Sequence, residues 1–226
     1  MTTSAKTSFR TQLQYGDAAT PELFTTLAEV RTIEPGEESA EPIEIVSHDS
    51  GTVESVSGGV TDSGEFTAEA LFANDATDTA VRAALGGAAG NWQICFPDFG
   101  ARTAAFTIDA DTEILTSAAH GLTTGQPIQV STSSALPAGL TAATTYWVHV
   151  LGDNTFTLHT TNAGAVADTG LVTVTTTGTG TQTLQIGTRV DFAGLVTSHK
   201  FGTAQRGNPL AITIKMRATG AQTVTS

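Results

Sequence analysis

The sequence is poor in cysteine, in charge and in long apolar runs. Its single cysteine, Cys95, excludes an intramolecular disulfide framework, and its apolar neighbours predict a buried thiol. The sequence has no run of about 18 apolar residues, so we expect no transmembrane helix. The first residues, Met-Thr-Thr-Ser-Ala-Lys, lack the apolar core of a signal peptide. We therefore expect no membrane association, and synthesis in a cytoplasm.

Basic side chains are scarce. Only 14% of the residues are charged, and 22 acidic against 10 basic side chains give a formal net charge of -12. DNA binding normally needs clusters of Lys and Arg that neutralise phosphates, so this balance argues against it. A surface that must repel DNA is compatible with the same balance.

The residue patterns that carry chemistry are also lacking. His149 and His159 lie diagonally across one predicted hairpin, but a metal ion would need two further ligands. Residues 178–180, Gly-Thr-Gly, lack the strand-to-helix context of a nucleotide-binding loop. No Ser or Cys has a visible His partner. We predict that the chain is not an enzyme and has no catalytic residue, no cofactor and no metal site.

The distribution of basic residues divides the chain into two parts. Residues 105–186 contain no Lys or Arg and are rich in Thr. We interpret them as a small all-β module inserted into a host domain made of residues 1–104 and 187–226. Without the insert, the predicted strands at 91–98 and 189–198 would be neighbours joined by a short turn, which is where insertions are tolerated best.

The host is predicted to be mainly β with one short flanking helix. In the last strand Leu210, Ile212, Ile214 and Met216 alternate with polar or small residues, which predicts one buried and one solvated face. Residues 65–72 alternate in the same way. A helix is predicted with Asp75 or Asn74 as its N-terminal cap, an apolar stripe, and Gly86-Gly87 as its end. The stripe consists of Val81, Ala84, Leu85 and Ala88.

Three host segments show no regular spacing of apolar residues: the arm 1–12, the Glu-rich residues 34–44 and the Gly-rich residues 50–63. We predict that the last two are loops, solvated and mobile respectively, with a short strand of Ile43, Ile45 and Val46 after the first. Such segments can become ordered against neighbours.

The insert is predicted to hold strands at 113–116, 127–132, 145–151, 155–160, 171–176 and 181–186, with a hairpin turn at Gly152-Asp153-Asn154. Trp147, His149 and His159 would share the outer face of this hairpin. They form a candidate surface patch for sugar rings, with ordinary packing as the alternative.

In sequence order, the host resembles the major tail tube proteins of lambda-like siphophages. The resemblance is carried by residues 13–30, 43–51, 64–72, the helix, 91–98, 192–197 and the last alternating strand. The insert resembles a Thr-rich β-module of phage virion proteins, at residues 120–125, 136–140 and 154–158.

The resemblance implies a tail-tube β-sandwich or barrel whose subunits form homohexameric rings. Stacked rings make the conduit through which viral DNA passes without specific binding, in the tail of a virion assembled in a bacterial host. A tape measure protein and a tail terminator are the implied partners. The insert is too large for a DNA-width channel, so we expect it on the outside of a long non-contractile tail.

Two sets of residues are candidates for assembly roles. Glu65, Thr67, Glu69 and Glu44 could face the channel, since a negative wall does not hold DNA; an outer solvated face is the alternative. Contacts between rings are assigned to Phe9, Arg10, Glu37, Glu38, Glu41, Val53 and Val56. Lys215 and Arg217 are expected near a subunit interface or against a neighbour's acid. A virion surface adhesin or capsid decoration protein that displays the Thr-rich module is the competing interpretation.

Overall fold

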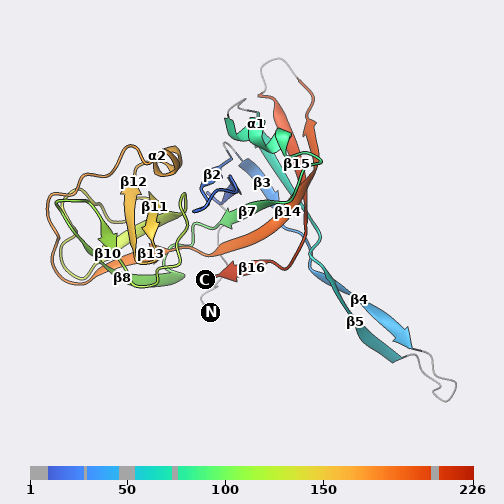
Figure 1. Ribbon diagram of the computed structural model, residues 1–226, viewed down its shortest axis with the longest axis horizontal. Helices are drawn as coiled ribbons and strands as arrows, with labels where there is room; N and C mark the ends of the chain where they lie inside the picture. Colours follow the sequence, from blue (N-terminus) through green and yellow to red (C-terminus); the bar gives the residue numbers. More distant parts are fainter. Residues whose placement is uncertain (1–9, 28–29, 46–53, 73–75, 205–208) are drawn as a thin grey trace, which may run out of the picture. The chain divides into compact units, whose positions relative to one another are not determined.

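The computed structural model describes residues 10–27, 30–45, 54–72, 76–204 and 209–226 (Figure 1). The predicted mainly-β class is confirmed. Two short helices, α1 (Ala76–Ala83) and α2 (Asn162–Ala167), accompany the strands. Neither has the length and apolar character of a membrane span within the described ranges. The strands are β1 (Gln12–Gly16), β2 (Phe24–Thr26), β3 (Val30–Glu34), β4 (Ser39–Ile45), β5 (Glu54–Asp62), β6 (Glu65–Leu71), β7 (Gly90–Cys95), β8 (Arg102–Ile108), β9 (Leu115–Thr116), β10 (Pro127–Thr132), β11 (Tyr146–Gly152), β12 (Thr155–His159), β13 (Gln182–Ile186), β14 (Arg189–Phe201), β15 (Ala211–Ala218) and β16 (Thr223–Thr225).

The chain divides into two compact units. Unit 1 comprises residues 1–27, 90–191 and 224–226, and unit 2 comprises residues 28–89 and 192–223. These limits differ from the predicted host and insert, because β1, β2 and β7 group with the barrel of unit 1. The inserted module 105–186 therefore stays a proposal.

Unit 1 contains a closed barrel in the strand order β10-β11-β12-β9-β8-β13. Its strands span residues 102–186. Alternate side chains point inward: Val148, Phe156 and Leu184 are all 0% exposed. Closure pairs every barrel strand on both sides, so the barrel leaves no free edge. In the same unit β7 pairs with β1, and β1 pairs with β2.

The middle of the insert differs from the prediction. Residues 171–176 form no strand, and Leu171 makes only an isolated bridge to His159. Residues 162–167 form the unpredicted helix α2, whose Thr161 caps the N-terminus and whose Asp168 ends it in a left-handed conformation. The capping residue Thr161 was the signal for this helix, because Asn162, Gly164 and Val166 within it have low helix propensity.

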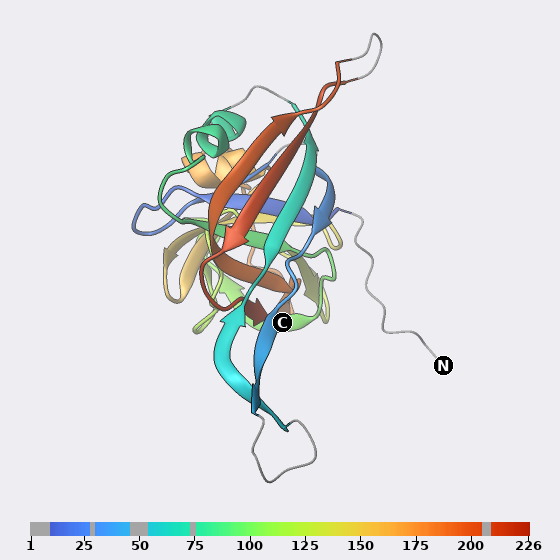
Figure 2. The ribbon, with the colours of Figure 1, turned by 90° about the vertical axis from the view of Figure 1, so that its right-hand side faces the viewer.

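Unit 2 contains a sheet in the order β14-β15-β6-β3 (Figure 2). Phe66 of β6 pairs with Met216, and Ala68 pairs with Ile214, so the apolar sets of two predicted alternating strands lie on the same buried face. Phe66 also stacks on Phe192 with ring centroids 4.0 Å apart. The alternation predicted for both strands is confirmed.

The segments predicted as loops at 34–44 and 50–63 contain β4 and β5, which pair as an antiparallel hairpin. That prediction was wrong. A two-stranded ribbon has no buried face to impose period-two alternation, and Pro42, Ile43, Glu44 and Ser55 are indeed exposed. The strands are defined by backbone pairing, which leaves no mark on the apolar pattern.

We expect Phe66→Ala to lower the free energy of unfolding by about 3–5 kcal/mol, because it removes a fully buried ring and its stacking partner. The measurement is chemical denaturation of the dilute protein. Thr67→Ala on the opposite face of β6 is the control, with a change of at most about 1 kcal/mol. Equal losses of stability for the two substitutions would contradict the assignment of Phe66 to the buried face of β6 and Thr67 to the opposite face.

Candidate assembly surfaces

The polar face of β6 carries three of the predicted channel residues. Glu65 and Glu69 are exposed and Thr67 is half-buried, while the residues between them are buried. The fourth candidate, Glu44, lies on β4 and not on this face. The structure thus brings three of the four together, in one row.

Two basic residues stand beside this row and are paired within their own chain. Lys215 Nζ lies 2.6 Å from Glu65 Oε1, and Arg217 Nη2 lies 2.6 Å from Asp62 Oδ2. Both basic side chains are about half exposed, so each pair contributes little to stability. Both bases meet acids of their own chain because β15 pairs directly with β6, and their place near a subunit interface or against a neighbour's acid stays a prediction. These contacts neutralise Glu65 and leave Glu69 as the exposed acid of the row.

The edge strands β2 of unit 1 and β3 of unit 2 differ in what covers them. In unit 1 the β2 edge is capped by the barrel: Phe24 N donates to Thr124 O (3.1 Å) and Thr26 N donates to Asn162 Oδ1 (2.9 Å). In unit 2 the last strand is β3, which pairs on one side with β6 and has no further strand beside it within the described residues. A free edge of this kind is a template for another chain.

The predicted ring-contact residues are spread over the arm and the hairpin. Phe9 and Val53 lie outside the described residues. Arg10 is exposed at the start of the first described range, and Glu37 and Glu38 are exposed before β4. Glu38 accepts a hydrogen bond from the backbone N–H of Gln222 (3.3 Å). Glu41 lies on β4 and Val56 on β5, where Val56 pairs with Ile43.

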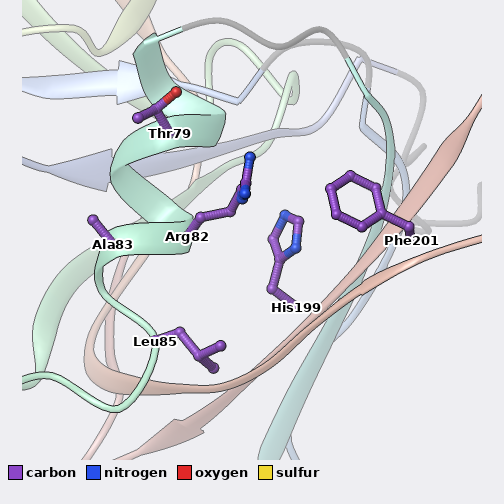
Figure 3. A pocket seen from close by; sticks show the side chains of 6 residues that line it. All are labelled: Thr79, Arg82, Ala83, Leu85, His199 and Phe201. Carbon is purple, nitrogen blue, oxygen red and sulfur yellow. The ribbon is translucent and has the colours of Figure 1, made fainter.

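A pocket of about 540 Å³ lies between α1 and the end of β14 (Figure 3). Beside it His199 Nε2 lies 3.2 Å from Asp78 Oδ1, with both side chains at least 94% buried. Arg82 extends from α1 over the ring of Phe201, with Cζ 5.6 Å from the ring centroid. The sequence could not show this cluster, because 121 positions separate Asp78 from His199.

The predicted apolar stripe of α1 is incomplete. Val81 is fully buried, but the helix ends at Ala83, and Leu85 and Ala88 are exposed. The buried neighbour of Val81 on this face is Asp78, which is held by His199. Leu85 is thereby left at the rim of the pocket with 48% of its surface exposed.

The predicted surface patch of the barrel is covered. His159 is 0% exposed, and Trp147 and His149 are half-buried, so the assignment of His159 to an exposed surface was wrong. The cause is α2 and the residues after it: His149 Nδ1 lies 2.7 Å from Ala165 O, and His159 Nδ1 lies 2.7 Å from Thr169 O. In the described ranges no three His, Cys, Asp or Glu side chains are placed to hold a metal ion.

A polar joint connects the barrel to the strands β1 and β7 of unit 1. Gln14 Nε2 donates to Gly125 O (2.7 Å), and Arg189 donates to Gln126 Oε1 (2.9 Å) and to Asp191 Oδ2 (2.8 Å). The buried thiol of Cys95 lies 3.6 Å from Gln14 Oε1, and burial raises its pKa to about 12. The predicted burial of Cys95 is confirmed, at 3% exposure.

The protein shares its fold with a chain in a solved tail. The structure titled "Tail of empty GTA particle computed with helical refinement, C6 symmetry" contains a chain with a TM-score of 0.50 and 14% identity, covering 98% of this chain and 100% of that one. A native gene transfer agent virion (TM-score 0.47, 13% identity, 98% and 100% coverage) and a baseplate of the anti-feeding prophage (0.47, 8%, 100% and 98%) are further matches. No family model and no curated protein matches the sequence.

Arg189→Met is expected to destabilise the protein by about 3 kcal/mol, because it leaves Asp191 and Gln126 without their cationic partner in the joint. Urea denaturation measures this loss. Arg82→Met is the control: Arg82 is exposed, and the change should stay within about 1 kcal/mol. If the polar joint did not stabilise the protein, the Arg189→Met and Arg82→Met variants would unfold at the same urea concentration.

Proposed function

We propose that this chain is a structural protein of a phage-type tail, and specifically the major tail tube subunit of a long non-contractile tail. Six copies form a ring, and stacked rings form the conduit for DNA. The chain then acts in the virion after synthesis in the bacterial host, with a tape measure protein and a tail terminator as partners. Its role needs no catalysis and no cofactor.

The observation that carries this proposal is that some sheet edges of the chain are covered while others are free. The barrel has no free edge, and the β2 edge is covered by it, whereas β3 and the β4–β5 hairpin offer unpaired backbone within the described residues. Monomeric proteins protect such edges. A subunit that joins its sheet to its neighbour's needs them open. The shared fold with a chain of a C6-symmetric tail supports the same arrangement.

The polar face of β6 is the proposed channel wall. The neighbouring bases Lys215 and Arg217 are each held by an acid of the same chain, so they are not free to hold a phosphate. Glu69 and Thr67 then present acid and hydroxyl to passing DNA. Glu44, on the hairpin, is left for subunit contacts.

The Thr-rich residues 105–186 are proposed to be an inserted module that decorates the outside of the tube. The barrel core comes entirely from residues 104–186, which suits a self-contained module. An outward module would obstruct a contractile sheath, and a non-contractile tail follows from that. An adhesin role gains no support from the hairpin patch, because α2 covers it.

Negative-stain electron microscopy of the purified protein at increasing concentration tests the proposal. We expect hollow tubes or six-membered rings, because open edges are complementary between copies. A stable monomer or trimer at all concentrations, with binding to glycans or cells, would instead support the adhesin alternative and end the tube proposal.

The channel assignment has its own test. Tubes of the variant Glu69→Lys should retain added double-stranded DNA against nuclease, because a lysine row along the channel binds phosphates. Tubes of the wild type should release it. Asp153→Lys makes the same charge change at an exposed turn of the barrel and is the control. Retention by both variants, or by neither, would remove Glu69 from the channel.

A further inference from the structure

The pocket beside α1 exposes apolar side chains that the fold leaves uncovered. The exposed large apolar side chains in the described part of unit 2 are Ile43 (54%), Leu85 (48%) and Phe201 (42%). Leu85 and Phe201 both line the pocket, and Ile43 lies on strand β4 of the hairpin. Two exposed apolar side chains at one concave site, here Leu85 and Phe201, are typical of a binding surface.

The end of unit 2 that holds the pocket is basic. Arg82 lines the pocket, and Lys200 lies between the pocket residues His199 and Phe201; both basic side chains are exposed. Exposed Arg31 follows Val30, which pairs with Ala70 near the same end of β6. Of the acids that the structure describes at this end, Asp78 is buried and paired with His199, and Glu69 is exposed.

The hairpin is acidic. The chain has no Lys or Arg between Arg31 and Arg82. Strands β4 and β5 carry four acids and no base: Glu41, Glu44, Glu54 and Asp62. Asp62 is engaged by Arg217. Exposed Ile43 therefore sits in an acidic strand, which is the chemical complement of an apolar pocket with a basic rim.

The two surfaces lie at opposite ends of one strand. Strand β5 leads into the first residue of β6, and α1 follows its last residue, so about 20 Å of strand separates them. Figures 1 and 2 both draw the hairpin and α1 at opposite ends of β6. Complementary surfaces at opposite ends cannot satisfy each other within one chain. Surfaces placed in this way can meet only between copies, in a head-to-tail contact that propagates along an axis.

We propose that the pocket formed by α1 and the end of β14 receives the acidic β4–β5 hairpin, through Ile43, of a second copy of this chain. The inference rests on the proposed tube function and deepens it, because it assigns the surface that joins one ring to the next. Arg82 and Lys200 attract the acidic hairpin, and Leu85 and Phe201 cover Ile43. The pocket is thereby a specific receptor and not a general apolar patch.

Cysteine cross-linking tests the contact directly. One preparation carries Ile43→Cys, the other carries Leu85→Cys, and the two are mixed under assembly conditions with a short bis-maleimide. Native Cys95 does not interfere, because it is 3% exposed and its pKa is raised to about 12. We expect a covalent dimer of the two variants. The control replaces Leu85→Cys by Leu151→Cys, a barrel position of matching exposure (49%), and should give no dimer.

The outcomes separate this inference from the proposed function. Tubes without the cross-link overturn the inference and leave the tube function standing. A cross-link without tubes or rings supports the hairpin contact and rejects the tube. Absence of both rejects both.

A second variant measures the strength of the contact. Leu85→Asp places a carboxylate at the pocket rim, where it repels the acidic hairpin, and should raise the concentration needed for assembly at least about tenfold. Leu151→Asp adds the same charge on the barrel and should leave this concentration unchanged. Sedimentation of assembled material gives the value for each variant. Equal values for the two variants would contradict the proposed receptor.

Discussion

Unpaired backbone at the β3 edge and along the β4–β5 hairpin is the constraint on which the rest of the account depends. A buried N–H or C=O must find a hydrogen-bond partner, and an exposed edge strand recruits one from another chain unless the fold blocks it. In unit 1 the fold blocks it by closing the barrel and by placing the barrel against β2. In unit 2 the described residues provide no such cover. In the proposed tube subunit, this open edge is the one that joins the neighbouring copy.

Side-chain chemistry follows the same division. The barrel holds its core and its strand pairing within residues 102–186, and Gln14 and Arg189 add hydrogen bonds to it from the rest of unit 1. Unit 2 exposes apolar side chains at both ends of β6, with exposed Arg82 and Lys200 at the α1 end and the acid-rich hairpin at the other. Among the described residues its basic side chains meet acids of the same unit at Lys215 with Glu65, Arg217 with Asp62, and His199 with Asp78. The proposed assembly completes unit 2 and leaves the barrel free.

The parts of the fold with a buried face could be predicted from the sequence. Strand β15 alternates because Ile214 and Met216 are buried, and the same holds for β6 and for the barrel hairpin. Most of the β4–β5 hairpin could not, since no buried face imposes a pattern on it; the short strand predicted at Ile43 and Ile45 overlaps only the end of β4. Helix α2 was missed because six residues are too few for a periodic signal, although Thr161 is a good cap.

The candidate site was less accessible to sequence reasoning than the fold. The row Glu65, Thr67 and Glu69 follows from alternation alone. The pairing of Lys215 with Glu65 depends on the register of two strands 150 positions apart, and the burial of His159 depends on a helix that the pattern did not reveal. The local spacing of apolar residues thus predicts which face of a strand a residue lies on. Its contact partners depend on how distant strands and helices pack.

Amide hydrogen exchange of the dilute and the assembled protein tests the central claim most directly, because it reports on the backbone groups themselves. The account predicts rapid exchange, in the dilute protein, of the amides of β3, β4 and β5 that face away from their paired strands. It predicts strong protection of the same amides after assembly, while the barrel amides change little. Unchanged exchange at β3 and the hairpin, with new protection confined to the barrel, would contradict it.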